Sequence, residues 1–222
     1  MPKLSSSHPP RRRTQAERTA ETRSKLIEAT IECLIERGYG GTTTLAICEV
    51  AGVSHGSLLH HFGRREVMLG AALEVVYARL RSKVVSQIEA LPEGEARVEA
   101  VVDLMWTGFG AREFKAVLEL WVAAANQPDV SWAVRPEARA FDEAITPLVE
   151  QLLPDLAERL PDFEVYVNLL FQALQGMGLA QATLPQTSES GPDPHAQIRA
   201  LLTRILVRAY TEAGPPDHQG PR

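Results

Sequence analysis

Apolar residues recur along most of the chain with the spacing of amphipathic helices. Within residues 14–37, four aliphatic side chains follow the order i, i+4, i+7 and i+8, which places them on one helix face. They are Ile27, Ile31, Leu34 and Ile35. The same period predicts further helices over residues 45–51, 55–61, 65–90, 95–110, 113–126, 131–158, 162–183 and 196–213. Because no segment alternates convincingly as a strand does, we expect an all-α chain of about nine or ten helices.

Small and hydroxyl-bearing residues mark the boundaries of the first three helices. Gly38 is expected to end the first helix, and the run Thr42-Thr43-Thr44 supplies an N-cap for the second. Gly52 then closes the second helix with a sharp turn, and Ser54 caps the third.

Prolines and polar segments punctuate the rest of the chain. Pro147 and Pro154 are expected to kink or split the range 131–158, because proline removes a helical hydrogen bond. Three segments contain too little apolar surface to offset the entropy of ordering. We expect tails or loops there, at residues 1–13, 185–195 and 214–222.

The net charge of −5 is distributed unevenly over the 222 residues. Residues 1–65 contain ten Lys and Arg against six Asp and Glu, a balance of +4, whereas the remaining 157 residues contain 13 against 22, a balance of −9. A basic N-terminal module on an acidic body suggests that this end meets a polyanion. No apolar run is long enough to span a membrane, and none follows the basic start as in a secretory signal, so we expect a cytoplasmic protein.

The stretch VAGVSHGSLLHHF, residues 50–62, has the proportions of a helix-turn-helix, in which two short helices meet at a tight turn. In a DNA-binding version the second helix enters the major groove and its first residues face the bases. Those residues are Ser54, His55, Gly56 and Ser57. Candidate phosphate contacts are Thr43, Thr44, Arg64, Arg65 and the arginines at 11–13. A plain α-hairpin inside a helical core is the alternative.

The histidines of this stretch also raise the question of a metal site. His55, His60 and His61 do not follow the i, i+3 or i+4 spacing that shares one helix face, and no nearby Cys or carboxylate completes a tetrahedral set. Cys33 and Cys48 fit no zinc or redox spacing and are expected in the core. No phosphate-loop, dinucleotide or nucleophile motif occurs. We therefore expect no metal, no cofactor and no enzymatic activity.

Residues 23–75, RSKLIEATIECLIERGYGGTTTLAICEVAGVSHGSLLHHFGRREVMLGAALEV, resemble the N-terminal DNA-binding domain of the tetracycline-repressor (TetR) family. The matching pieces, in register, are the apolar first helix, GY followed by threonines, AGVS-x-G-x-L, the closing HHF and R-x-E-V-M-L. The remaining chain agrees in length and helical layout but carries no motif. With the polar ends at 1–13 and 214–222 expected as a disordered basic arm and a disordered tail, the resemblance implies a helix-turn-helix domain at 14–66 and a ligand-binding and dimerisation domain at 67–213.

The resemblance also implies a role for individual residues of the DNA-binding domain. Thr43 or Thr44 caps the second helix and touches phosphate, and residues 54–57 begin the recognition helix. The family's backbone-contacting positions are occupied here by Leu59, His60, His61 and Arg65.

Two positions depart from the family pattern. Leu59 stands where the family usually has tyrosine, so a phosphate hydrogen bond is expected to be missing. His55 stands where lysine or arginine is common, which predicts weaker or pH-sensitive base readout.

Large aromatic and sulfur-containing side chains gather in the ranges 95–110, 113–126 and 131–158. They form either the core of the second domain or the wall of an apolar ligand cavity, and the resemblance favours a cavity. The candidate lining residues are Met105, Trp106, Phe109, Trp121 and Phe141.

A polar stripe crosses the otherwise apolar range 162–183. Asn168, Gln172 and Gln175 lie at i, i+4 and i+7, where their amides orient a ligand, pair across a subunit interface or face solvent. With no buried cation evident, a neutral apolar ligand is expected. This helix and the last one resemble the family's dimerisation pair. Close approach is expected at Gly176, Gly178 and Ala180, and apolar contact at Leu201, Leu202, Ile205, Leu206 and Ala209.

The sequence thus predicts a homodimeric transcriptional repressor that a small apolar ligand releases from a palindromic operator in double-stranded DNA. Two-fold pairing would set the recognition helices about 34–36 Å apart, which is one turn of DNA. Two alternatives stay open. One is a helix-turn-helix regulator without a small-molecule effector, either an activator or a protein-responsive switch. The other is a helical binding protein or enzyme whose corner is purely structural.

Overall fold

The computed structural model describes residues 14–183, 193 and 195–213. Over these ranges the chain forms ten α-helices, one short 3₁₀ turn and no strand, which confirms the all-α prediction. The helices are α1 (Gln15–Gly41), α2 (Thr44–Ala51), α3 (His55–Phe62), α4 (Arg65–Val85), α5 (Glu95–Phe109), α6 (Phe114–Asn126), α7 (Pro128–Leu152), α8 (Pro154–Arg159), α9 (Phe163–Thr183) and α10 (Ala196–Glu212). The expected arm at 1–13, the tail at 214–222 and most of the loop at 185–195 lie outside the described residues.

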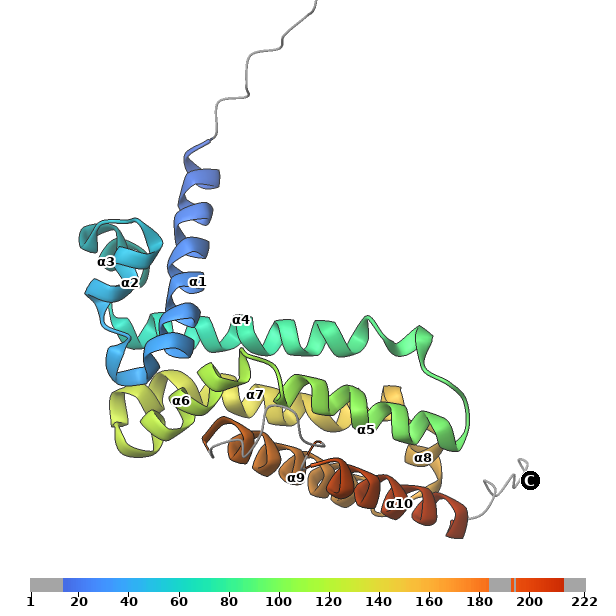
Figure 1. Cartoon of the computed structure of the whole chain (residues 1–222). Helices are drawn as coiled ribbons and strands as arrows, with labels where there is room; N and C mark the ends of the chain where they lie inside the picture. Colours follow the sequence, from blue (N-terminus) through green and yellow to red (C-terminus); the bar gives the residue numbers. More distant parts are fainter. Residues whose placement is uncertain (1–13, 184–192, 194, 214–222) are drawn as a thin grey trace, which may run out of the picture.

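Helix α1 projects from one end of the helical body, where it packs on α4 and α6, and α2 and α3 lie beside it (Figure 1). It begins at a capping box, in which the Thr14 hydroxyl accepts from the Glu17 amide and the Glu17 carboxylate accepts from the Thr14 amide. The aliphatic stripe predicted for this helix is buried, as expected. At Gly38 the backbone reaches φ 66°, which interrupts the helix before a last turn that ends at Gly41.

Helix α4 joins this N-terminal part to the helical body, along which it runs (Figure 1). It packs against α1 and α3 on one side of the junction and against α5, α6 and α7 in the body. Gly70 lies where a Cβ would meet the Ala133 carbonyl oxygen at 2.6 Å, so α4 and α7 approach each other closely there. A single helix therefore contacts both the helix-turn-helix and the body.

Two of the predicted helical ranges have other bounds in the structure. The helix expected at 65–90 ends at Val85, and a 3₁₀ turn, Ile88–Ala90, follows it. The segment expected at 131–158 begins earlier, with Pro128 in its first turn, and splits at Pro154, whereas Pro147 lies inside the continuous α7. Proline disfavours helical backbone in the residue before it, which fits Leu153 at φ −130° and ψ 59°.

The body is a layered bundle with a continuous apolar core. Helix α6 packs on α1, α4, α7 and α9, while α5 packs on α9 and α10. The largest wholly buried side chains of the body are Leu120, Leu152, Leu170 and Leu174. None of the helices in the described part of the chain has the length and apolarity that a membrane span requires.

Candidate DNA-binding surface and apolar cavity

The turn between α2 and α3 has the geometry of a helix-turn-helix corner. Gly52 adopts left-handed backbone, φ 65° and ψ 35°, and the Val53 amide donates to the Cys48 carbonyl at 3.1 Å. The Ser54 hydroxyl then accepts from the Ser57 amide at 3.2 Å and so caps α3, as predicted. The left-handed glycine and the cap together fix the direction in which α3 leaves the turn.

Of the two threonines proposed as the cap of α2, Thr43 is the one in place. Its hydroxyl accepts from the Ala46 amide at 3.1 Å, whereas Thr44 is the first residue inside the helix. Behind the corner, Ile47 and Leu58 are wholly buried in the same apolar core as Leu26 of α1, and α2 packs on α1. The corner is therefore packed on an apolar core.

The opposite face of α3 is open to solvent. Five of its candidate DNA contacts are exposed: Ser54, His55, Gly56, Leu59 and His60. Ser57 and His61 are half-buried at the edge of this face. A Cβ at Gly56 would touch only the Ser54 hydroxyl oxygen, at 4.0 Å, so no part of the body covers the start of the helix.

The two arginines that follow α3 lie in different surroundings. Arg64 is exposed and its guanidinium stacks over the ring of Trp132 in α7, 5.1 Å from the ring centroid. Arg65 is half-buried: Nη2 donates to the Tyr39 carbonyl at 3.2 Å, and the guanidinium covers the Tyr39 ring at 4.4 Å. The phosphate-contacting position implied for Arg65 is thus engaged within the chain, at the junction of α1 and α4.

The histidines of α3 lie apart from acidic and thiol partners. The rings of His60 and His61 meet edge to face at 5.5 Å. Among the residues that the structure describes, no group of three or more His, Cys, Asp or Glu side chains is placed to hold a metal ion. Burial raises the pKa of the Cys33 and Cys48 thiols.

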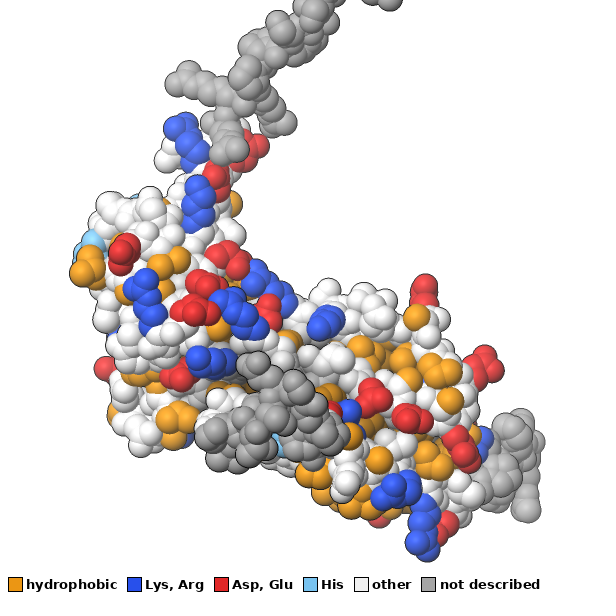
Figure 2. Space-filling view, in the orientation of Figure 1, with side chains coloured by type: hydrophobic (Ala, Val, Ile, Leu, Met, Phe, Trp, Pro, Cys, Tyr) orange, Lys and Arg blue, Asp and Glu red, His pale blue; other side chains and the backbone are white. Residues whose placement is uncertain are grey.

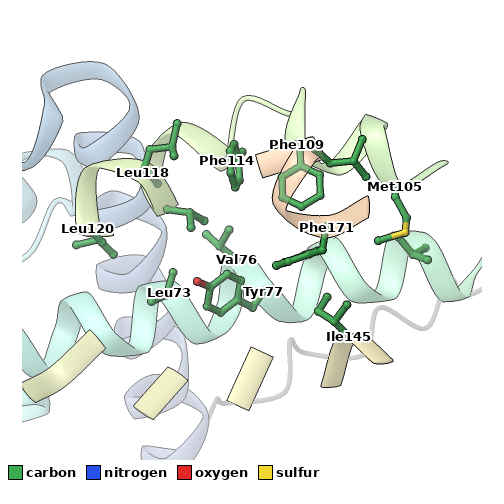
Figure 3. Close-up of a cluster of buried hydrophobic side chains, with 14 of the residues drawn as sticks. Leu73, Val76, Tyr77, Met105, Phe109, Phe114, Leu118, Leu120, Ile145 and Phe171 are labelled. Atoms are coloured by element: carbon green, nitrogen blue, oxygen red, sulfur yellow. The ribbon is translucent and has the colours of Figure 1, made fainter. Parts of the chain in front are cut away.

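A small apolar cavity lies in the body between α4, α5, α7 and α9. Its volume is about 50 Å³, and Figure 3 shows Tyr77, Phe109 and Phe171 converging on this region. The remaining lining residues include Met105, Gly108, Phe114, Phe141 and Ile145. Tyr77 stacks on Phe141 with ring centroids 4.0 Å apart and receives a hydrogen bond from the Trp121 indole at 3.0 Å. Burial raises the pKa of Tyr77, so its hydroxyl stays neutral.

The cavity adjoins an open cleft of about 440 Å³ between α4 and α7. Tyr77, Arg81 and Phe141 line both spaces, which makes the stacked ring pair the wall between them. Glu74 and Glu137 lie on the cleft side. A molecule that entered from the cleft would have to displace these rings.

Three of the predicted ligand-binding residues line this cavity and five do not. Met105, Phe109 and Phe141 line it, while Trp121 lies behind the lining residues Tyr77 and Phe114 and contacts both. The others lie elsewhere: Trp106 packs against His195, Asn168 and Gln172 are exposed on α9, and Gln175 is half-buried. The polar stripe of α9 therefore does not face the cavity, because it is the other side of that helix that packs into the core.

Both parts of the chain match families of known proteins. The family of bacterial regulatory proteins of the tetR type matches residues 26–72, and the tetracyclin repressor-like C-terminal domain matches residues 92–208. The chain belongs to the TetR family. Members of this family are DNA-binding transcriptional regulators, and the two matches, which begin within α1 and end within α10, together take in most of the chain.

Several curated regulators resemble this TetR-family chain. It is 28% identical over 170 residues to the HTH-type transcriptional regulator CymR of Pseudomonas putida, covering 77% of this chain and 84% of CymR. It is 28% identical over 198 residues to an uncharacterized HTH-type regulator of Mycobacterium bovis, covering 88% and 97%. It is 34% identical over 110 residues to the HTH-type transcriptional regulator BetI of Escherichia coli, covering 48% of this chain and 56% of BetI.

Solved structures share the TetR fold of the chain. A TetR-family regulator from Rhodococcus sp. superposes with a TM-score of 0.66 at 18% identity, covering 86% of this chain and 99% of the other. The multidrug binding protein EbrR, complexed with imidazole, gives 0.59 at 21%, covering 84% and 93%. Bacillus subtilis FadR in complex with stearoyl-CoA gives 0.61 at 14%, covering 84% and 98%.

The last two helices of this TetR-family chain leave an apolar face uncovered. Figure 2 shows hydrophobic side chains at the surface in the region of α9 and α10. The large exposed apolar residues of these two helices are Val165, Leu169, Leu179, Ile198, Leu201 and Ile205. Three residues expected at a dimer contact, Leu202, Leu206 and Ala209, are instead buried within the chain, where α10 packs on α5. Gly178 is likewise buried, against Phe109 and Phe114.

Sequence reasoning missed three residues that the structure places at important contacts. Tyr77 and Phe171 line the cavity, and Tyr39 joins the helix-turn-helix to the body. The apolar period of α4 contains the signal for Tyr77, since it lies one helical turn after the buried Leu73. The contacts of Tyr39 join it to residues 80 and 88 positions away, which no local pattern reveals.

Proposed function

We propose that this TetR-family chain is a homodimeric repressor that acts in the cytoplasm by binding rather than by catalysis. In this proposal α3 enters the major groove of a palindromic operator, with Ser54, His55, Gly56 and Ser57 toward the bases. Thr43, Thr44, Leu59, His60 and His61 lie against the DNA backbone. The observation that carries the proposal is that α3 is capped and packed on an apolar core while its opposite face is open to solvent.

The dimer contact is proposed on the exposed face of α9 and α10. Val165, Leu169 and Leu179 share one face of α9, because they lie four and fourteen residues apart, and Gln172 and Gly176 lie between them. Exposed apolar side chains that share one helix face are typical of protein contacts. Asn168 and Gln172 then serve as polar partners across the interface, the second of the roles considered for the stripe.

The effector is proposed to be a small, neutral, apolar molecule that occupies the cavity beside Tyr77 and Phe141. The lining is almost entirely aromatic and aliphatic, which such ligands prefer. Proteins of the same fold bind small molecules: the structures of EbrR with imidazole and FadR with stearoyl-CoA support an effector site here. Ligand and operator would then oppose each other through one coupling free energy.

One observation favours a second candidate, a regulator without a small-molecule effector. The cavity of about 50 Å³ is well below the roughly 300–1,000 Å³ of ordinary small-molecule sites. An effector must therefore enlarge it by displacing the stacked pair of Tyr77 and Phe141, whereas an effector-free regulator needs no such change.

Operator binding is tested by selecting DNA from a random-sequence pool with the wild-type protein. We expect a palindromic site whose affinity falls steeply with salt, and Ser57→Ala to change the preferred bases under α3. Ser82→Ala, an exposed serine of α4 far from α3, is the matched control and should select the wild-type site. Selection of no DNA, or a salt-independent affinity, would contradict the proposal.

A further inference from the structure

Tyr39 is held by three side chains from outside its own helix. Its amide donates to Glu119 Oε2 at 2.8 Å and its hydroxyl donates to Gln127 Oε1 at 2.6 Å. Its carbonyl accepts from Arg65 Nη2 at 3.2 Å, and the same guanidinium covers its ring at 4.4 Å. Every polar group of this residue is therefore bound by α4, by α6 or by the residue that ends α6.

These contacts place Tyr39 at the junction between the helix-turn-helix and the body, here called the joint. It follows Gly38, where α1 is interrupted, and precedes Thr42, whose amide donates to the Tyr39 carbonyl and whose hydroxyl donates to the Gly38 carbonyl. The next residue, Thr43, caps α2. The position of the Tyr39 peptide thus sets where the helix-turn-helix begins.

Helix α6 and the residue at its C-terminal boundary bind Tyr39 at two points eight residues apart. Glu119 lies in its middle, and Gln127 is the residue that ends it. A third tie lies near its start, where Arg112 bonds the carboxylates of Glu32 and Glu36 in α1 at 2.7 and 2.6 Å. This last pair of contacts is exposed and contributes little by itself. At Tyr39, the bonds to Glu119 and Arg65 are half-buried, whereas the hydroxyl bond to Gln127 is exposed.

We propose that Glu119, Gln127 and Arg65 form a clamp on Tyr39 that fixes the orientation of the helix-turn-helix on the body. In this arrangement the four are positioning residues for DNA binding rather than DNA contacts. The inference deepens the proposed function, since it rests on operator binding by two such domains. It also assigns Arg65 a role other than the phosphate contact expected from its sequence position.

The clamp predicts a property that simple packing does not, namely a narrow range of distances between α3 and the body. Spin labels at His60→Cys in α3 and Glu150→Cys in α7, both exposed positions, report this distance when labelled chain is diluted into excess unlabelled chain. The native thiols of Cys33 and Cys48 are buried, so the labels report the new sites. The readout needs no DNA and holds for a monomer or a dimer.

We expect a narrow distance distribution in the parent and a clearly broader one in Glu119→Ala. Glu119→Gln keeps an acceptor oxygen for the Tyr39 amide and should restore the narrow distribution. Glu99→Ala, which removes an exposed glutamate of α5, is the matched control. If Glu119→Ala does not fold, Tyr39→Phe removes only the hydroxyl bond to Gln127 and should broaden the distribution less. Widths that stay equal to the control in the folded variants would overturn the clamp.

A second readout uses operator geometry. With the site selected by wild type and versions whose half-sites are one base pair closer or farther, the wild-type dimer should prefer the native spacing. In Glu119→Ala we expect this preference to fall at least threefold, while Ser57→Ala lowers affinity for all spacings alike. An unchanged preference in Glu119→Ala would contradict the clamp. Selection of no DNA by wild type would contradict operator binding instead, and the distance distribution would still decide the clamp.

Discussion

At the scale of single residues, adjacent side chains of the same type make different contacts because they face different parts of the molecule. Arg64 and Arg65 are neighbours at the start of α4, yet one is exposed over Trp132 and the other is half-buried on Tyr39. The family pattern implied a phosphate contact for Arg65, because the sequence alone does not show that Tyr39 lies against its guanidinium. The roles of the capping residues Thr43 and Ser54 were predictable, because caps depend on residues only three positions away.

Glu137 gives a pH prediction at this scale. Partial burial, and then the charge of Glu74 across the cleft, raise the pKa of Glu137 above its ordinary value. The folded state thus binds this proton more tightly than the unfolded state, so stability falls as pH rises through the raised pKa. We expect Glu137→Gln to raise the melting temperature at pH 7, by about 1 °C, and to give no gain below about pH 4, where the carboxyl is protonated in both states.

The control for this effect is Glu99→Gln, an exposed glutamate of α5. Melting curves of both variants between pH 4 and pH 8 separate the two. A gain for Glu137→Gln that is equal at all pH values would show that packing, not charge, is responsible.

At the scale of helices, the period of apolar residues located the helical ranges, and the prolines indicated the break before α8, but neither said which face meets which neighbour. In α9 the notable glycines are two residues apart, and close helix approach was expected at both. The structure separates them: Gly176 has nothing within 4 Å, whereas a Cβ at Gly178 would meet Phe114 at 2.9 Å and the Phe109 carbonyl oxygen at 3.1 Å. Only packing of α9 against α5 and α6, which lie far away in sequence, makes this distinction.

Alanine at these two positions should therefore have opposite effects. Gly178→Ala forces the Phe109 and Phe114 contacts apart, at a cost of about 1–3 kcal/mol that exceeds the gain in helix propensity. Gly176→Ala should leave the unfolding free energy unchanged or raise it by up to about 1 kcal/mol. If the α9 face pairs two chains, Gly176→Ala weakens association in sedimentation, whereas Gly178→Ala does not act on that face. Equal destabilisation of both variants in denaturant would contradict this assignment.

At the scale of the whole molecule, α6 lies between the cavity and the DNA-binding part. Trp121 on α6 donates to Tyr77, which lines the cavity, and Glu119, two residues earlier, binds Tyr39 at the joint. Residues two apart on a helix point in nearly opposite directions, so a single turn of α6 contacts the cavity lining on one side and Tyr39 on the other. A ligand that displaces Tyr77 from Phe141 would thus disturb the hydrogen bond between Tyr77 and Trp121 of α6. The same helix carries Glu119, which binds Tyr39.

Filling the cavity should separate effector binding from DNA binding. Gly108 lines the cavity, and a Cβ there would meet only Leu80, at an ordinary 3.9 Å, so Gly108→Val places its side chain in the space at little cost. The probe is N-phenyl-1-naphthylamine, a neutral apolar dye that fluoresces in apolar surroundings. We expect the dye to bind wild type and weaken operator binding at least fivefold. Gly108→Val should bind the dye at least tenfold more weakly and retain wild-type operator affinity without it.

The matched control is Ala96→Val, which adds a valine at an exposed position of the same helix and should bind the dye as wild type does. Because the two variants share helix and side chain, a difference between them reports the cavity alone. Dye binding that survives Gly108→Val would place the apolar site elsewhere. Dye that binds wild type without weakening the operator complex would favour the regulator without a small-molecule effector, since a ligand shifts DNA affinity only if it distinguishes the two states.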